Sequence, residues 1–185
     1  MNTFFSAPHI HLPSVDSTNN YASNLLKLPD TKDKSVITTD FQTSGKGQRG
    51  NTWTTLPGNA FLGSFIVPCK LNQEKLFNLS KWIALCLAEI FSEMGVSSVS
   101  IKWPNDIWVN NQKIAGILIE NQWQGNQIKH SIVGIGINLL PTPPALLKHS
   151  TSLQQQLNKT YSLSEILKLI QLKFDQNWKF LDPKE

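Results

Sequence analysis

A long antiparallel hairpin is the feature of this sequence that most constrains its fold. Two apolar runs, Lys113–Trp123 and Ile128–Ile137, are rich in isoleucine, and Gly125-Asn126 between them is a dipeptide typical of tight hairpin turns. A pair of strands is not stable in isolation, so further elements must pack against this hairpin and bury its apolar side chains.

The remaining elements follow in an order that does not alternate between strand and helix. Short apolar runs predict further strands at His9–Leu12, Val36–Phe41, Ala60–Val67, Val99–Trp103 and Ile107–Val109. Apolar residues at three- and four-residue steps predict helices after Ser17, over Asn72–Met94, and after a capping box formed by Ser162 and Glu165. We therefore expect one α+β domain over residues 1–185, with a mixed, mainly antiparallel sheet and flanking helices.

The glycine pair in Gly134-Ile-Gly136 also bears on the fold. A dinucleotide-binding turn needs a further glycine that opens a helix, and none follows here. The sequence therefore argues against a Rossmann fold. We interpret the pair as a close backbone approach within a sheet.

Gln42–Trp53 is the first candidate functional segment. Its three glycines alternate with cationic and amide side chains. Glycine permits positive φ, so backbone N–H groups can converge on an anion, and Lys46 and Arg49 add charge where a polyphosphate would bind. Trp53 offers a flat face for packing on a base or for anchoring the loop. The segment lacks the ending of a Walker motif, and its composition is also typical of a flexible, solvated basic loop.

Two further segments carry polar residues near predicted strand ends. Pro104 imposes a turn after Lys102, so Asn105 and Asp106 would project from its tip. Asp106 could orient a cation or an amine, and Lys102 could meet a phosphate, although an ordinary turn has the same sequence. Lys113 begins the next strand, where it could pair with a carboxylate or serve only as a strand-edge lysine.

Composition argues against several classes of function. The formal net charge is +4, but Arg49 is the only arginine, whereas readers of duplex DNA use several. The four histidines form no metal-ligand pattern, and no Gly-x-Ser-x-Gly motif for a nucleophilic serine is present. No apolar run approaches the roughly 20 residues that span a bilayer. With no secretory signal at Met1–Pro8, we expect a cytoplasmic protein that binds neither DNA nor membrane.

Together these segments resemble the catalytic domain of biotin–protein ligases. The matching stretches occur in the family's order: Val15–Asn19, Gln42–Trp53, Ile101–Ile107, Lys113–Glu120 and Val133–Leu139. The resemblance implies the fold shared by class II aminoacyl-tRNA synthetases and biotin ligases. It also implies the activity of a biotin–[acetyl-CoA-carboxylase] ligase. Such an enzyme uses ATP and Mg²⁺ to join biotin, through biotinyl-5′-AMP, to a specific lysine of a biotin carboxyl carrier protein.

The same resemblance assigns roles to the matching residues. The biotin head group would be hydrogen-bonded by Ser17, Thr18 and Gln42, and its pocket lined by Gly116 and Leu118. The catalytic residues would be Lys113 on the biotin carboxylate and α-phosphate, Lys102 on the phosphates, and Asp106 orienting Mg²⁺ or the incoming lysine. ATP and the adenylate would be bound by Gly45, Lys46, Gly47, Arg49, Trp53, Asn105 and Asn138, with Trp53 beside the adenine. No residue is predicted to hold a metal permanently.

The sequence departs from the family in its loop and at its ends. Gln48 and Asn51 stand where many relatives have arginine, and Lys46 occupies another arginine position, so the loop has less positive charge. We expect a ligase without the N-terminal DNA-binding domain of bifunctional relatives. We also expect the usual small C-terminal β-barrel to be absent or cut off.

Two alternative functions remain open at this stage. A lipoate or octanoate ligase is the nearest enzyme, and the segment Lys102–Asp106 disfavours it. A non-catalytic adenylate-binding protein belongs to a different class, and the reduced charge of the loop motivates it. The family also suggests that two sheets pair edge to edge in a homodimer, which no residue of this sequence tests.

Overall fold

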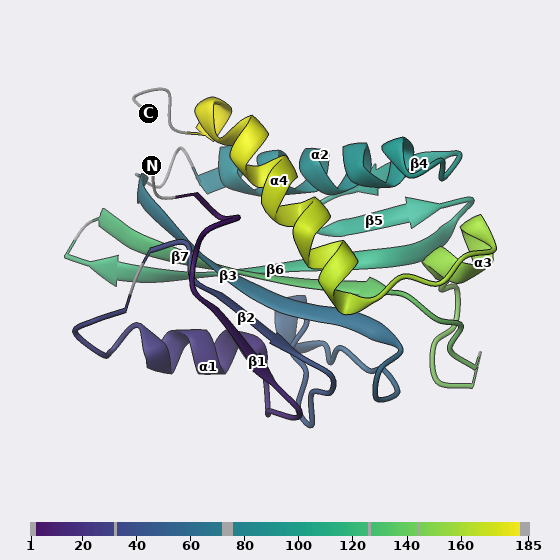
Figure 1. The fold of residues 1–185 in the computed structure, drawn as a ribbon, viewed down its shortest axis with the longest axis horizontal. Coiled ribbons are helices and arrows are strands. Elements are labelled where there is room, and N and C mark those ends of the chain that lie inside the picture. Colours follow the sequence, from purple (N-terminus) through teal and green to yellow (C-terminus); the bar gives the residue numbers. More distant parts are fainter. Residues whose placement is uncertain (1–2, 32, 72–75, 126, 144, 182–185) are drawn as a thin grey trace.

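A seven-stranded sheet forms the centre of the molecule (Figure 1). The computed structural model describes residues 3–31, 33–71, 76–125, 127–143 and 145–181. The strands are β1 (His9–Leu12), β2 (Val36–Thr39), β3 (Ala60–Leu71), β4 (Val99–Lys102), β5 (Asp106–Val109), β6 (Gln112–Gln124) and β7 (Gln127–Asn138). Their order is β1-β2-β3-β7-β6-β5-β4. β1 pairs with β2 in parallel and the other neighbours are antiparallel, which confirms the expected mixed, mainly antiparallel sheet.

The predicted long hairpin is β6–β7, and it lies in the middle of the sheet. Gly116 pairs with Gly136, and Leu118 pairs with Gly134. On its other side β7 pairs with β3, where Leu62 lies opposite Gly136 and Ser64 lies opposite Gly134. Gly125 has a φ of +61° at the hairpin end, and Asn126 lies outside the described residues. Three adjacent strands thus place three glycines and a serine between two leucines on one face.

Helices cover both faces of the sheet, as Figure 1 shows. α2 (Leu76–Glu93) and α4 (Leu163–Leu181) pack together on one face, and α1 (Thr18–Leu25) packs on β2, β3 and β7 from the other. Successive strand residues point to opposite faces. Accordingly Phe65 belongs to the large core under α2 and α4, whereas its neighbour Ile66 belongs to a small core under α1.

The helix ends follow the sequence signals in part. At α4, Glu165 N donates to Ser162 Oγ at 3.2 Å and Ser162 N donates to Glu165 Oε2 at 2.8 Å, so the predicted capping box is confirmed. The predicted helix over 72–94 is seen as α2, with its expected first residues 72–75 outside the described part of the chain. The short helix α3 (Leu153–Leu157) was not predicted. Among the described helices, none combines the length and apolar character needed to cross a bilayer.

Candidate functional site

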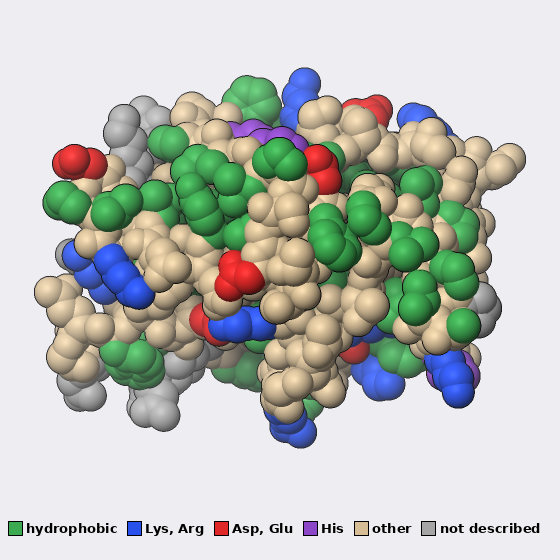
Figure 2. Space-filling model, turned by 90° about the horizontal axis from the view of Figure 1, so that it is seen from below, with side chains coloured by type: hydrophobic (Ala, Val, Ile, Leu, Met, Phe, Trp, Pro, Cys, Tyr) green, Lys and Arg blue, Asp and Glu red, His purple; other side chains and the backbone are tan. Residues whose placement is uncertain are grey.

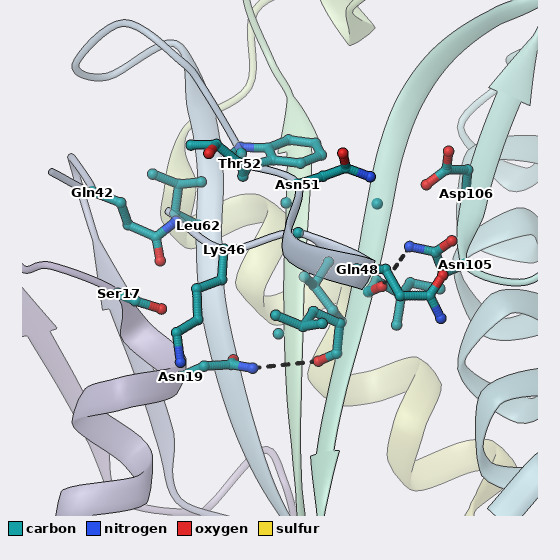
Figure 3. Close-up of a pocket in the computed structure, with 18 of the residues that line it drawn as sticks. Ser17, Asn19, Gln42, Lys46, Gln48, Asn51, Thr52, Leu62, Asn105 and Asp106 are labelled. Atoms are coloured by element: carbon teal, nitrogen blue, oxygen red, sulfur yellow. Dashed lines mark hydrogen bonds between the residues drawn. The ribbon is translucent and has the colours of Figure 1, made fainter. Parts of the chain in front are cut away.

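A pocket of about 290 Å³ opens on the α1 side of the sheet. Its floor is the centre of β3, β7 and β6, its wall is the start of α1, and the loop of residues 43–53 folds over it (Figure 3). Twelve of the residues predicted to form the site line this pocket: Ser17, Thr18, Gln42, Lys46, Gly47, Arg49, Trp53, Asn105, Asp106, Lys113, Gly116 and Leu118. Folding therefore brings four separate stretches of sequence together around one cavity.

The floor depends on glycines that leave room above the strands. A Cβ atom at Gly136 would lie 2.6 Å from Cε2 and Cζ2 of Trp53, and one at Gly116 would lie 2.8 Å from its Cζ3. The indole of Trp53 therefore rests directly on the paired backbones of β6 and β7. A Cβ at Gly134 would lie 2.5 Å from Asn19 Oδ1, so α1 also approaches closely. The close backbone approach predicted for Gly134 and Gly136 is confirmed.

The wall beside α1 is a buried network of hydroxyl and amide groups. Thr18 donates to Gln42 Oε1 through its backbone N at 2.9 Å and through its Oγ1 at 3.1 Å. Ser64 Oγ lies 2.7 Å from Thr18 Oγ1 and 2.6 Å from Asn19 Oδ1. Thr18, Asn19 and Ser64 are each at most 3% exposed. Such a network holds polar atoms in fixed positions, which suits recognition of a small polar group.

Ser17 has a position that the sequence pattern explains only in part. It is the N-cap residue of α1 with extended φ and ψ, yet its side chain makes no capping hydrogen bond. Instead the residue lines the pocket, where Figure 3 shows it beside Gln42. Its hydroxyl therefore does not cap the helix, and the residue is part of the pocket lining.

The opposite end of the pocket carries an ion pair. Lys113 Nζ lies 2.7 Å from Asp106 Oδ1 and 5.3 Å from the ring centroid of Trp53. The backbone of Lys113 is fixed on both sides, because its N donates to His149 O and its O accepts from Thr151 N, each at 2.9 Å. Only the side chain of Lys113 can adjust, so its ammonium stays at this end of the pocket.

Asn105 fixes the turn that carries Asp106. Its Nδ2 donates to Ile117 O at 3.1 Å, and its backbone O accepts from Ile117 N at 2.8 Å. The turn is thereby tied to β6, one strand residue away from Gly116. Asp106 therefore faces the pocket from a supported position.

The loop above the pocket is a small folded hairpin. Gly47 N donates to Asn51 O at 2.7 Å, and Trp53 N donates to Gly45 O at 2.9 Å. Arg49 lies at its tip with a φ of +56°. At the base of the loop, Ser44 N donates to Asp16 O. The pKa of Asp16 is lowered by hydrogen bonds from Asn20 and from the backbone of Ser17, and to a smaller extent by the charge of Lys46. The structure therefore differs from the flexible basic loop that composition alone would allow.

Three predicted residues lie outside the lining of this pocket. Lys102 extends over the ring of Trp108, 3.8 Å from its centroid, on the edge strand β4. Asn138 is 4% exposed and donates through Nδ2 to Lys113 O at 3.3 Å and to Thr151 O at 3.0 Å. Gly45 lines a second hollow, between the loop and the Leu118 and Glu120 positions of β6. Lys102 and Asn138 thus contact protein groups where the resemblance implied phosphate and adenylate.

Sequence reasoning missed Asn19, Ser64 and Glu120 as residues of the site. Asn19 and Glu120 end two of the stretches that carry the family resemblance, so their positions were a usable signal. Ser64 is a single hydroxyl residue within the otherwise apolar run Leu62–Val67, apart from Gly63. A lone buried hydroxyl in a central strand needs a partner, and that need could have identified it.

The pocket offers few groups to a metal ion. No group of three or more histidine, cysteine, aspartate or glutamate side chains that could hold one is found among the described residues. Asp106 is the single carboxylate among the residues described as lining the main pocket. Mg²⁺ commonly binds through one or two carboxylates together with substrate phosphates, so the site fits an ion that arrives with a nucleotide.

Basic side chains on the face that carries α1 lie singly. Figure 2 shows them separated by apolar and uncharged side chains, with acidic side chains beside some of them. The described residues on this face therefore form no continuous basic stripe of the kind that follows a nucleic-acid backbone.

Comparison with known proteins gives consistent matches. The model of the biotin/lipoate A/B protein ligase family matches residues 11–138. The chain is 33% identical over 131 residues to the bifunctional ligase/repressor BirA of Escherichia coli, covering 69% of this chain and 39% of that protein. It is 33% identical over 139 residues to the biotin–[acetyl-CoA-carboxylase] ligase of Paracoccus denitrificans, covering 72% and 55%. The chain thus spans well under two thirds of the length of these relatives.

A solved structure is similar over nearly the whole chain. The biotin protein ligase from Aquifex aeolicus in complex with biotin and ATP superposes with a TM-score of 0.76 at 27% identity. The similarity covers 96% of this chain and 73% of that one.

Proposed function

Because the chain belongs to the biotin/lipoate A/B protein ligase family, we propose that it joins biotin to a lysine of a biotin carboxyl carrier protein, using ATP and passing through biotinyl-5′-AMP. One observation carries this proposal. A single pocket has a wall of hydroxyl and amide groups at one end and the Lys113–Asp106 ion pair at the other, above a floor of glycines. That arrangement suits a ligand with a polar head, an apolar chain and a carboxylate tail.

The wall beside α1 would hold the urea of biotin. Gln42 Oε1 already accepts two hydrogen bonds from Thr18, so the Nε2 of Gln42 is the atom that would donate to the urea oxygen. The hydroxyl of Ser17 would take a further polar atom of the head group. Leaving those urea atoms without partners in a buried pocket would cost about 1–3 kcal/mol each, and this cost is the basis of selectivity.

Lys113 would act on the first half-reaction. A carboxylate oxygen of biotin attacks the α-phosphorus of ATP, the bond to the bridging oxygen breaks, and pyrophosphate leaves. The ammonium of Lys113 lies where the carboxylate tail would meet the α-phosphate, so it can stabilise the charge that develops there. Lys46 and Arg49 line the pocket from the loop and would face the departing pyrophosphate.

The second half-reaction would use the same end of the pocket. The neutral amine of the carrier lysine attacks the carbonyl carbon of the mixed anhydride, an amide bond forms and AMP leaves. Asp106, a carboxylate that lines this end of the pocket, would orient that amine. Mg²⁺ bound with ATP would reduce the charge on the phosphates, and Asp106 is also the residue that would reach it.

The decisive experiment is biotin-dependent exchange of labelled pyrophosphate into ATP, followed by transfer of biotin to a carrier domain. We expect exchange with biotin and not with lipoate at equal concentration. Exchange with lipoate alone would support a lipoate ligase, and no exchange with either acid would contradict the enzymatic function.

A further inference from the structure

Glu120 lies between the rigid wall of the pocket and the loop above it. Its Oε2 accepts a hydrogen bond from Asn19 Nδ2 at 2.8 Å. Its Oε1 lies 3.4 Å from the ammonium of Lys46, with the two side chains 37% and 42% exposed. One carboxylate therefore contacts both the start of α1 and the loop.

Asn19 connects this carboxylate to the residues that would bind the ligand. Its Oδ1 lies 2.6 Å from Ser64 Oγ, which lies 2.7 Å from Thr18 Oγ1. Asn19 is 2% exposed and is pressed against the backbone of Gly134. Because its amide is held by contacts on both sides, Asn19 fixes the position of the carboxylate that it binds.

We propose that Glu120 is a positioning residue that holds the loop over the pocket through Lys46 and couples the loop to the ligand wall. A ligand that hydrogen-bonds Thr18 and Gln42 engages the fixed network that ends at Glu120, so an occupied wall strengthens the contact of Glu120 with Lys46. The loop then covers the pocket when the wall is occupied. The ligand part of this proposal rests on the proposed function, whereas the contact between Glu120 and the loop does not.

The sequence provides a specific probe of loop opening. Arg49 is the only arginine in the chain and lies exposed at the loop tip, so an arginine-specific protease cuts at the single bond Arg49–Gly50. When opening and closing are fast compared with cleavage, the cleavage rate follows the fraction of open loops. The rate measured without any ligand therefore reports how strongly the loop is held.

Glu120→Gln is the informative variant, because its amide oxygen can still accept from Asn19 while its charge toward Lys46 is gone. We expect cleavage to be about two- to five-fold faster, the range of a partly exposed ion pair. Lys46→Met should have the same effect, and the double variant should be no faster than either single variant, because both remove the same contact.

Glu93→Gln is the matched control. It breaks the ion pair with Lys173, at 2.5 Å, between α2 and α4 on the other face of the sheet. We expect it to leave the cleavage rate unchanged. Equal rates in Glu120→Gln and the unaltered protein would overturn the proposal, as would a rise of the same size in Glu93→Gln, because the effect would then be general destabilisation.

Biotin itself tests the coupling. We expect saturating biotin to slow cleavage of the unaltered protein and to slow it less in Glu120→Gln, with biotin affinity in calorimetry falling by the same factor as the lost protection. Equal protection in both proteins would overturn the coupling. If the unaltered protein binds no biotin in calorimetry, the proposed function fails, while the cleavage rates without ligand still decide whether Glu120 holds the loop.

Discussion

The floor and the loop of the pocket are built in opposite ways. The floor consists of three central strands that pair without interruption over Ala60–Pro68 and Ala115–Gln122. In the wall beside it, Thr18, Asn19 and Ser64 are at most 3% exposed. The loop is closed by backbone bonds such as Gly47 N to Asn51 O, and by the exposed pair Lys46–Glu120. Opening the floor would break the central sheet and its core, whereas opening the loop breaks a few exposed contacts. The wall that would recognise a ligand and the loop that adds Lys46 and Arg49 therefore differ in stability.

Trp53 is the physical link between these two regions. It ends the loop, and its indole lies on Gly116 and Gly136 of the floor. Its Nε1 is buried without a hydrogen-bond partner among the described residues. Burying a polar atom without a hydrogen bond is unfavourable. We therefore expect the contact between the ring and the floor to change when a ligand offers this nitrogen a partner.

The largest effect should come from the rigid region. In Lys113→Ala the supported ammonium at the end of the pocket is lost, and we expect adenylate formation to fall by about 10²-fold or more, as for removal of a preorganised group that stabilises developing charge. The measurement is single-turnover formation of the adenylate from biotin and ATP. Lys159→Ala, which removes a lysine that contacts Tyr161 instead of the pocket, is the control. An unchanged rate would mean that Lys113 is only a lysine at a strand edge and has no role in adenylate formation.

A smaller effect should follow from a substitution in the floor that displaces the loop. In Gly136→Ala the new methyl group would lie 2.6 Å from the ring of Trp53, so the ring and the loop attached to it must move. Such overpacking costs about 1–3 kcal/mol. We expect most of this cost to destabilise the closed position of the loop. We expect faster cleavage at Arg49–Gly50 and slower adenylate formation, with a sheet that remains folded by circular dichroism.

Gly125→Ala separates this effect from a general loss of stability. Gly125 lies at the end of the same hairpin with a φ of +61° and has no neighbour within 4 Å of an added Cβ. The substitution should lower thermal stability through backbone strain and leave the loop closed. Equal cleavage rates in the two alanine variants would mean that Trp53 does not link floor and loop.

The sequence predicted the floor better than the contacts around it. The β6–β7 hairpin follows from two apolar runs and the turn chemistry between them, which are local signals, and so does the close approach at Gly134 and Gly136. The expected fold class is confirmed by the sheet order and by the likeness to the Aquifex aeolicus biotin protein ligase. Of the twelve predicted site residues that line one pocket, Gly116 and Leu118 lie in the middle of β6, and the others lie at or next to a strand end, at a helix start or in the loop.

Contacts between distant segments could not be predicted in this way. Glu120 meets Asn19 and Lys46 only because β6, α1 and the loop converge, and no local pattern encodes that convergence. Lys102 pairs in register with Asp106 but stands one strand farther from the pocket, so its long side chain covers Trp108. Asn138 ends β7 beside two carbonyl groups that its amide satisfies. The spacing of motifs along the sequence predicts none of these contacts.

The smallest expected effect belongs to the loop tip and tests its exposure. Arg49 is exposed and faces the pocket opening, so its attraction for phosphates acts largely through solvent. We expect Arg49→Gln to raise the KM for ATP only a few-fold at low ionic strength. The effect should disappear near 1 M salt, where the screening length is about 3 Å. Lys159→Gln removes one positive charge outside the pocket lining and should leave the KM for ATP unchanged at both salt concentrations. A loss that persists at high salt would place Arg49 in a desolvated contact with phosphate, and the loop would then be as preorganised as the floor.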